Sequence, residues 1–214
     1  VVGYEYNKHS FYPYYSSYAE VANFLKDVII SQNSYGLFLP MCYMYRNAIE
    51  LGLKRLIIED SHIDRERALK IMKKKKHSIL GLWNSIVDEI KEYSYAPDDD
   101  TTIVDAQKYI KAFHDFDQNS DLFRYPCNKN MQPYFSQAII FDIENISTCC
   151  QELCNFLDCV DSMLSEVKNF ESEMASYYSD YWNIASLVHN ILKLAELPIM
   201  FIILKIKYFY GGIL

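Results

Sequence analysis

The chain has 214 residues, of which 50% are hydrophobic and 23% are charged, as expected for one folded domain with or without a helical extension. Its formal net charge of −7 excludes attraction of nucleic acid by bulk charge, so a contact with RNA or DNA would need a local basic patch. Six glycines and six prolines leave few positions for the tight turns of a sheet-rich fold.

The first half of the chain predicts a series of amphipathic helices, because apolar residues recur there close to the helical period. The predicted helices cover residues 14–31, 37–59, 64–93 (as one helix or a pair) and 102–116. Asp100 or Thr101 is expected to cap the last of these helices. No segment alternates with period two for long enough to indicate a sheet, so the predicted fold class is all-α.

The stretch from Tyr134 to Leu197 contains no Gly or Pro and carries an unbroken 3-4 spacing of apolar residues. The seam positions are Ile146, Cys149, Leu153, Phe156, Val160, Met163, Val167, Phe170, Met174, Tyr177, Tyr181, Ile184, Val188, Ile191 and Ala195. This heptad pattern predicts a coiled coil or long helices packed at a shallow angle. Two arrangements remain open: one continuous helix, or a helical hairpin that bends near residues 175–180.

The six cysteines indicate reduced thiols rather than a disulfide framework, because most of them cluster on one predicted helix. Cys150 and Cys154 lie four residues apart, but no His or further Cys pair has matching spacing, so we expect no metal and no cofactor. The first residues do not resemble a signal peptide. The apolar segment Pro198–Leu214 is too short to span a bilayer. The expected location is therefore the cytoplasm.

Two charged patterns accompany the predicted helices. Arg46, Glu50 and Lys54 follow one another at four-residue intervals with alternating sign, which favours an exposed face that supports the helix; a polar stripe lining a cleft is the alternative. A basic run is formed by Arg65, Arg67, Lys70, Lys73, Lys74, Lys75 and Lys76. A solvated helix end explains that run most simply, and nucleic-acid binding is the functional alternative.

Three local signatures occur in a fixed order. They are Leu39–Lys54 (LPMCYMYRNAIELGLK), Lys76–Trp83 (KHSILGLW) and Asp121–Pro126 (DLFRYP). Together they resemble the bacterial HEPN-like (higher eukaryote and prokaryote nucleotide-binding) helical proteins over roughly residues 10–160. The resemblance implies an antiparallel helical bundle that usually dimerises, often as a metal-independent ribonuclease in a toxin–antitoxin or antiviral defence system.

The usual HEPN active motif, an Arg followed four to six residues later by a His, is missing here. Arg124 is followed by Tyr-Pro-Cys-Asn-Lys-Asn-Met, without a His. A ribonuclease site would have to be assembled from separate segments. RNA cleavage needs a base and a cation, so His77 would be the base, Arg124 the clamp for the phosphate, and Glu50 the group that orients His77. The structural alternatives are a His bonded to a carboxylate and an Arg paired with a nearby acid.

The sequence as a whole predicts a HEPN-like helical core over residues 1–133 and a long helical element over residues 134–214 that completes the bundle and provides an oligomerisation face. The expected function is a non-catalytic interaction module of a bacterial defence or toxin–antitoxin system, acting as a homodimer or with a helical partner protein. The alternative is an endoribonuclease that uses Arg124, His77 and Glu50, with RNA held by Arg46 and Lys73 to Lys76.

Overall fold

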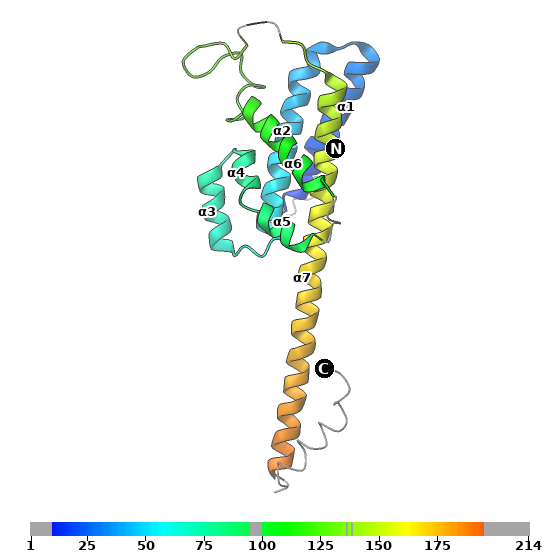
Figure 1. Ribbon diagram of the computed structural model, residues 1–214, viewed down its shortest axis with the longest axis vertical. Coiled ribbons are helices and arrows are strands. Elements are labelled where there is room, and N and C mark those ends of the chain that lie inside the picture. Colours follow the sequence, from blue (N-terminus) through cyan, green and yellow to red (C-terminus); the bar gives the residue numbers. More distant parts are fainter. Residues whose placement is uncertain (1–9, 95–99, 136, 138, 195–214) are drawn as a thin grey trace, which may run out of the picture. The chain divides into compact units, whose positions relative to one another are not determined.

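The fold is all-α, as the sequence predicts (Figure 1). The structure, a computed structural model, describes residues 10–94, 100–135, 137 and 139–194. Within these ranges it contains no β-strand, and its one isolated bridge pairs Cys127 with Pro133. The α-helices are α1 (Tyr12–Gln32), α2 (Phe38–Arg55), α3 (Arg65–Lys75), α4 (Ile79–Trp83), α5 (Val87–Tyr93), α6 (Thr102–Phe116) and α7 (Ile143–Leu194).

Short non-α helices flank α2. A 3₁₀ helix, η1 (Tyr35–Leu37), precedes it, and a π-helical turn, η2 (Leu56–Asp60), follows it. The region predicted as one helix or a pair contains three helices. Lys76 breaks it after α3, since its backbone φ of 50° lies outside the right-handed helical region. Ser78 then begins α4, where its hydroxyl accepts a hydrogen bond from the Gly81 amide at 3.1 Å.

Helices α1 and α2 form a closely packed pair joined by a tight turn. Asn33 ends α1 in the left-handed conformation, with φ of 52°, which asparagine tolerates better than most residues. Gly52 on α2 lies against side chains of both α1 and α7. A Cβ atom there would come within 2.9 Å of Leu157 Cδ1 and 3.0 Å of Tyr15 Cε2, so the absence of a side chain permits this packing.

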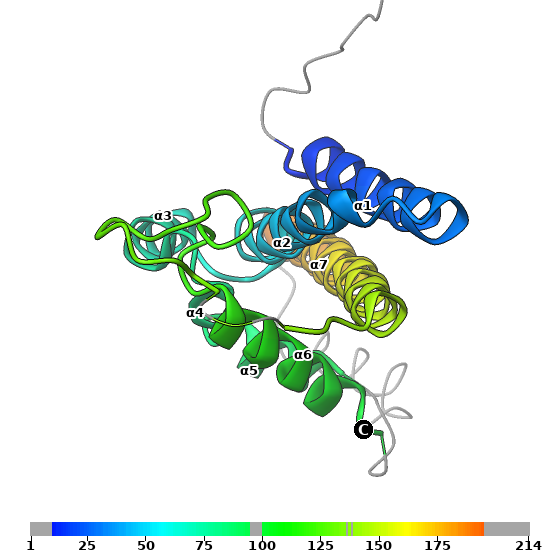
Figure 2. The same ribbon diagram turned by 90° about the horizontal axis from the view of Figure 1, so that it is seen from above.

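The chain divides into two compact units, Val1–Lys168 and Asn169–Leu214. The first unit includes the beginning of α7, whereas the sequence places a division between residues 133 and 134. The reason is that this part of α7 contributes to the core. Its buried side chains are Cys150, Leu153, Cys154, Leu157, Val160 and Leu164. Seen from above, α2 and the beginning of α7 lie between α1 on one side and α4 to α6 on the other (Figure 2).

The stretch with the heptad pattern forms one continuous helix from Ile143 to Leu194. Over these residues the structure contradicts the alternative of a hairpin that bends near residues 175–180. Ala195 and the segment 198–214 lie outside the described residues, as do residues 95–99 between two of the predicted helices. Nowhere in the described ranges does a helix combine the length and hydrophobicity needed to cross a membrane.

Candidate functional site

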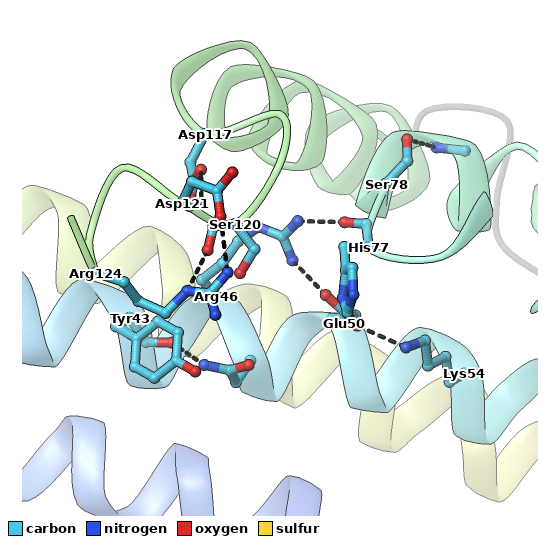
Figure 3. A network of polar contacts seen from close by, with 12 residues as sticks. Tyr43, Arg46, Glu50, Lys54, His77, Ser78, Asp117, Ser120, Asp121 and Arg124 are labelled. Carbon is cyan, nitrogen blue, oxygen red and sulfur yellow. Dashed lines mark hydrogen bonds and ion pairs between the residues drawn. The ribbon is translucent and has the colours of Figure 1, made fainter. Parts of the chain in front are cut away.

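A buried ion pair on α2 is the centre of the polar network in Figure 3. Arg46 and Glu50 lie one helical turn apart, and Arg46 Nη1 is 3.2 Å from Glu50 Oε2. Arg46 is 0% exposed and Glu50 is 5% exposed. The prediction that these residues belong to an exposed supporting face is therefore wrong. The structure also contradicts the predicted contact of Arg46 with nucleic acid, because a buried guanidinium cannot reach a phosphate.

His77 and Lys54 complete the network around Glu50. His77 Nδ1 lies 3.0 Å from Glu50 Oε1, and Lys54 Nζ lies 2.6 Å from the same oxygen. The Arg46 guanidinium also donates a hydrogen bond from Nη2 to the backbone carbonyl of His77. Arg46 thus connects α2 to the turn between α3 and α4 in two ways, through the main chain of His77 and through Glu50 (Figure 3).

The charges in this network offset the effect of burial. Burial acts to raise the pKa of Glu50, but hydrogen bonding and charge from Lys54, together with the charges of Arg46 and His77, hold that pKa below its ordinary value. Burial lowers the pKa of Arg46, and the charges of Glu50 and Asp117 oppose that change. Glu50 is therefore a carboxylate at neutral pH that accepts from three cationic or potentially cationic side chains.

Arg124 has a separate set of partners. Its Nη2 lies 2.9 Å from Asp121 Oδ1, and its Nε donates to the Ser120 carbonyl at 2.6 Å. Its guanidinium carbon lies 5.7 Å from the centre of the Tyr43 ring, a cation–π distance. In Figure 3, Arg46 lies between Arg124 and His77. The structure thus brings Glu50 and His77 into contact, whereas the polar partners of Arg124 are Asp121 and Ser120.

Sequence reasoning missed Asp117 and His114 as neighbours of this network. The Asp117 Oδ1 atom accepts from the backbone amides of Asp121 and Leu122, at 2.9 and 3.3 Å, and so shapes the loop that carries Arg124. Burial, followed by the charge of Arg46, lowers the pKa of His114. Neither residue lies in a recognisable motif, since both approach Arg46 only in the folded structure.

His77 offers the most accessible chemistry of the network. Its side chain is 63% exposed, and its Nδ1 atom is occupied by Glu50. This arrangement leaves Nε2 as the ring nitrogen available to a ligand, with a carboxylate orienting the imidazole. The nearest cation to the pair is Lys54 rather than Arg124. The geometry is that of an oriented base without the arginine clamp that the sequence predicted.

The basic run lies on and just after α3. Lys73, Lys74 and Lys76 are exposed and Lys75 is partly buried. Lys73 to Lys75 lie in the last turn of α3 and Lys76 caps its C-terminal end. Positive charge at this end interacts favourably with the helix dipole. Helix-end stabilisation accounts for their position, and their predicted role in nucleic-acid binding stays a prediction.

A second polar cluster joins the end of α2 and η2 to α7 within the first compact unit. Arg55 Nη2 lies 2.5 Å from Asp161 Oδ2, and Ser165 Oγ donates to Asp60 Oδ1 at 3.2 Å. Burial, a hydrogen bond with Asp161 and the charge of Asp161 raise the pKa of Asp60 from its ordinary 3.8 to about 7. Among the described residues, no group of three or more His, Cys, Asp or Glu side chains is arranged to hold a metal ion.

The raised pKa of Asp60 predicts a pH-dependent stability. Between about pH 4 and about pH 7 the folded state keeps a proton that the unfolded state releases, so the contribution of Asp60 to stability falls as pH rises through this window. Asp60→Asn does not titrate. We expect the stability of the variant relative to the wild type to increase as pH rises from about 4 to about 7. Urea unfolding of both proteins measures the difference in stability. A difference that does not change with pH would contradict the raised pKa of Asp60.

Comparisons of the chain with protein-family models, with curated proteins and with solved structures gave no match.

Proposed function

We propose that the chain is a non-catalytic helical interaction module that associates with a second copy of itself through the C-terminal part of α7. The observation that carries the proposal is an exposed apolar surface on this part of the helix. We call it the α7 stripe. It consists of Phe170, Tyr177, Tyr178, Tyr181, Ile184, Leu187, Val188 and Ile191, which are each between 42% and 66% exposed.

The α7 stripe has the geometry of a pairing surface. With Tyr181 and Val188 as a positions, Ile184 and Ile191 are d positions, and Tyr178 and Leu187 fall on the flanking e and g positions. Trp182 is also exposed but lies off the stripe, at b. Fully burying one such large side chain stabilises by about 1.5–3 kcal/mol. Association that covers the stripe therefore has a substantial driving force.

A second copy is the partner that this pattern suits best. Heptad seams pack by inserting side chains of one helix between those of another helix with the same repeat, and two copies of the chain satisfy that requirement without any other protein. Contiguous exposed apolar surface is also uncommon on monomeric proteins and marks interaction sites. A role in a bacterial defence or toxin–antitoxin system, which the HEPN-like resemblance implies, is part of the proposal.

A charge placed on the α7 stripe tests the proposal. Ile184→Asp would put a carboxylate into the buried seam, and we expect it to shift the protein from oligomer to monomer in cross-linking and size-exclusion experiments. Ser186→Asp is the matched control, because it introduces the same charge on the opposite side of the same helix. If both variants cross-link as the wild type does, the stripe is not the association surface.

A second candidate function, endoribonuclease activity, is favoured by the contact between His77 and Glu50. The exposed imidazole has the accessibility that a general base needs. Under the interaction-module proposal, purified protein leaves RNA intact. Under the enzyme candidate it cleaves RNA, and His77→Ala lowers the rate by about 100-fold or more, whereas Arg124→Ala has a smaller effect because Arg124 is held by Asp121. Cleavage that persists in His77→Ala would remove His77 from the site.

A further inference from the structure

The first compact unit contains an apolar cavity of about 310 Å³ between α2, α6 and the beginning of α7. This volume lies within the range of small-molecule sites, roughly 300–1,000 Å³. The cavity opens at the surface beside the exposed residues Ala112 and Asn145, and concave sites of this kind are typical of small ligands. It is distinct from the network around Glu50, none of whose side chains lines it.

The walls of the cavity are mainly aromatic. Its phenylalanines are Phe38 at the start of α2, Phe113 and Phe116 on α6, and Phe123 and Phe141 in the segment between α6 and α7. Their rings form a connected set: the Phe38 and Phe141 centroids are 4.7 Å apart, and those of Phe116 and Phe141 are 5.6 Å apart. Aromatic side chains pack favourably against a further ring in offset or edge-to-face geometry.

The floor of the cavity carries no charge. It is formed by the buried side chains of Cys42 and Ile49 from α2 and Cys150 and Leu153 from α7. Burial raises the pKa of the Cys42 thiol to about 12 and that of Cys150 well above its ordinary value, so both thiols are neutral. No lining residue in the described part of the chain has a charged side chain. A charged ligand would lose its hydration here without gaining a partner.

The rim provides a small number of polar groups. Tyr109 directs its hydroxyl to Glu152 at 3.1 Å, so that hydroxyl already has a partner. Asn145 is exposed and contributes a side-chain amide at the edge of the cavity. Ala112 lies on the exposed surface of α6 and also lines the cavity, which places it at the entrance.

We propose that this cavity binds a neutral aromatic small molecule, with its rings among the phenylalanines and at most one hydrogen-bonding group toward Asn145. The chemical class of the ligand follows from the lining residues. The phenylalanine rings favour an aromatic ligand, and the uncharged walls disfavour an ion. The volume of the cavity limits the ligand to a few rings. The proposal does not depend on self-association through the α7 stripe.

The test uses the full chain and the neutral dye N-phenyl-1-naphthylamine, whose fluorescence increases in an apolar site. We expect saturable binding with one dye per chain. Ala112→Trp, which fills the entrance from an exposed position, should weaken binding by about tenfold or more, since the displaced contacts amount to at least about 1.4 kcal/mol. Gln107→Trp is the matched control, because it adds the same ring on α6 away from the cavity and should leave binding unchanged.

A charged analogue and an α7 variant complete the test. The sulfonated dye 1-anilinonaphthalene-8-sulfonate should bind at least about tenfold more weakly than the neutral dye, because its anion has no partner in the cavity. Ile184→Asp should bind the neutral dye as the wild type does. The proposal is overturned if Ala112→Trp binds like the wild type, if both dyes bind equally, or if Ile184→Asp alone abolishes binding, which would place the dye on the α7 stripe.

Discussion

Arg46→Ala is expected to lower the free energy of unfolding by about 3 kcal/mol, the lower end of the range for removing one partner of a buried ion pair. Arg46 is fully buried, and its guanidinium bonds both Glu50 and the His77 carbonyl. The substitution leaves a buried carboxylate with fewer partners and releases the turn between α3 and α4. Lys54 and His77 still contact Glu50, which is why the effect should not reach the upper end.

Arg124→Ala is the control for this prediction. It removes the same side chain from a position where that side chain is 37% exposed and pairs with Asp121 three residues away. Such pairs contribute about 0–1 kcal/mol. Chemical denaturation of both variants measures the difference. Equal losses of stability in the two variants would contradict the stabilising role of the buried ion pair between Arg46 and Glu50.

Leu157→Ala should have the second large effect, a loss of about 2–5 kcal/mol. Leu157 is 2% exposed and packs on α2 beside Gly52, within the first compact unit. Truncation would remove buried methyl groups and leave a cavity that this tight contact between helices cannot easily close.

Leu187→Ala is the matched control on the same helix. Leu187 is 60% exposed, so its truncation should change the unfolding free energy by no more than about 0.5 kcal/mol, while weakening self-association. Thermal or urea unfolding at low protein concentration separates the two effects. A large loss of stability from Leu187→Ala under those conditions would mean that the α7 stripe is buried in the monomer.

Secondary structure followed from local patterns in this chain wherever the patterns were long. The predicted helix over residues 102–116 matches α6 at both ends within a residue, and the heptad pattern predicted the helical stretch that α7 occupies. The region 64–93 was less predictable, because the break at Lys76 depends on a positive backbone φ, which a lysine rarely adopts.

The heptad pattern alone did not show which part of α7 is buried. Leu153 and Val160 are in the core, whereas Tyr181 and Val188 occupy equivalent positions and are exposed. Apolar side chains with the same spacing are buried in the core near the beginning of α7 and exposed near its end. Only the placement of α1 and α2 beside the beginning of α7 distinguishes the two cases.

The candidate site was predicted in part. Glu50 and His77, proposed as partners from different segments, do meet at 3.0 Å. Arg124 does not join them, since the loop after α6 holds it against Asp121 and Ser120. Arg46 was expected at a nucleic-acid surface because charged residues are usually exposed. Its burial depends on closure of the turn between α3 and α4 over α2, a tertiary event without a local sequence signal.

The molar mass of the intact chain in solution tests the central claim most directly. Sedimentation equilibrium over a range of protein concentrations should give a mass that is a multiple of the 25.2 kDa chain, and Ile184→Asp should return it to that of one chain. A wild-type mass of 25.2 kDa at every concentration would contradict self-association through the α7 stripe.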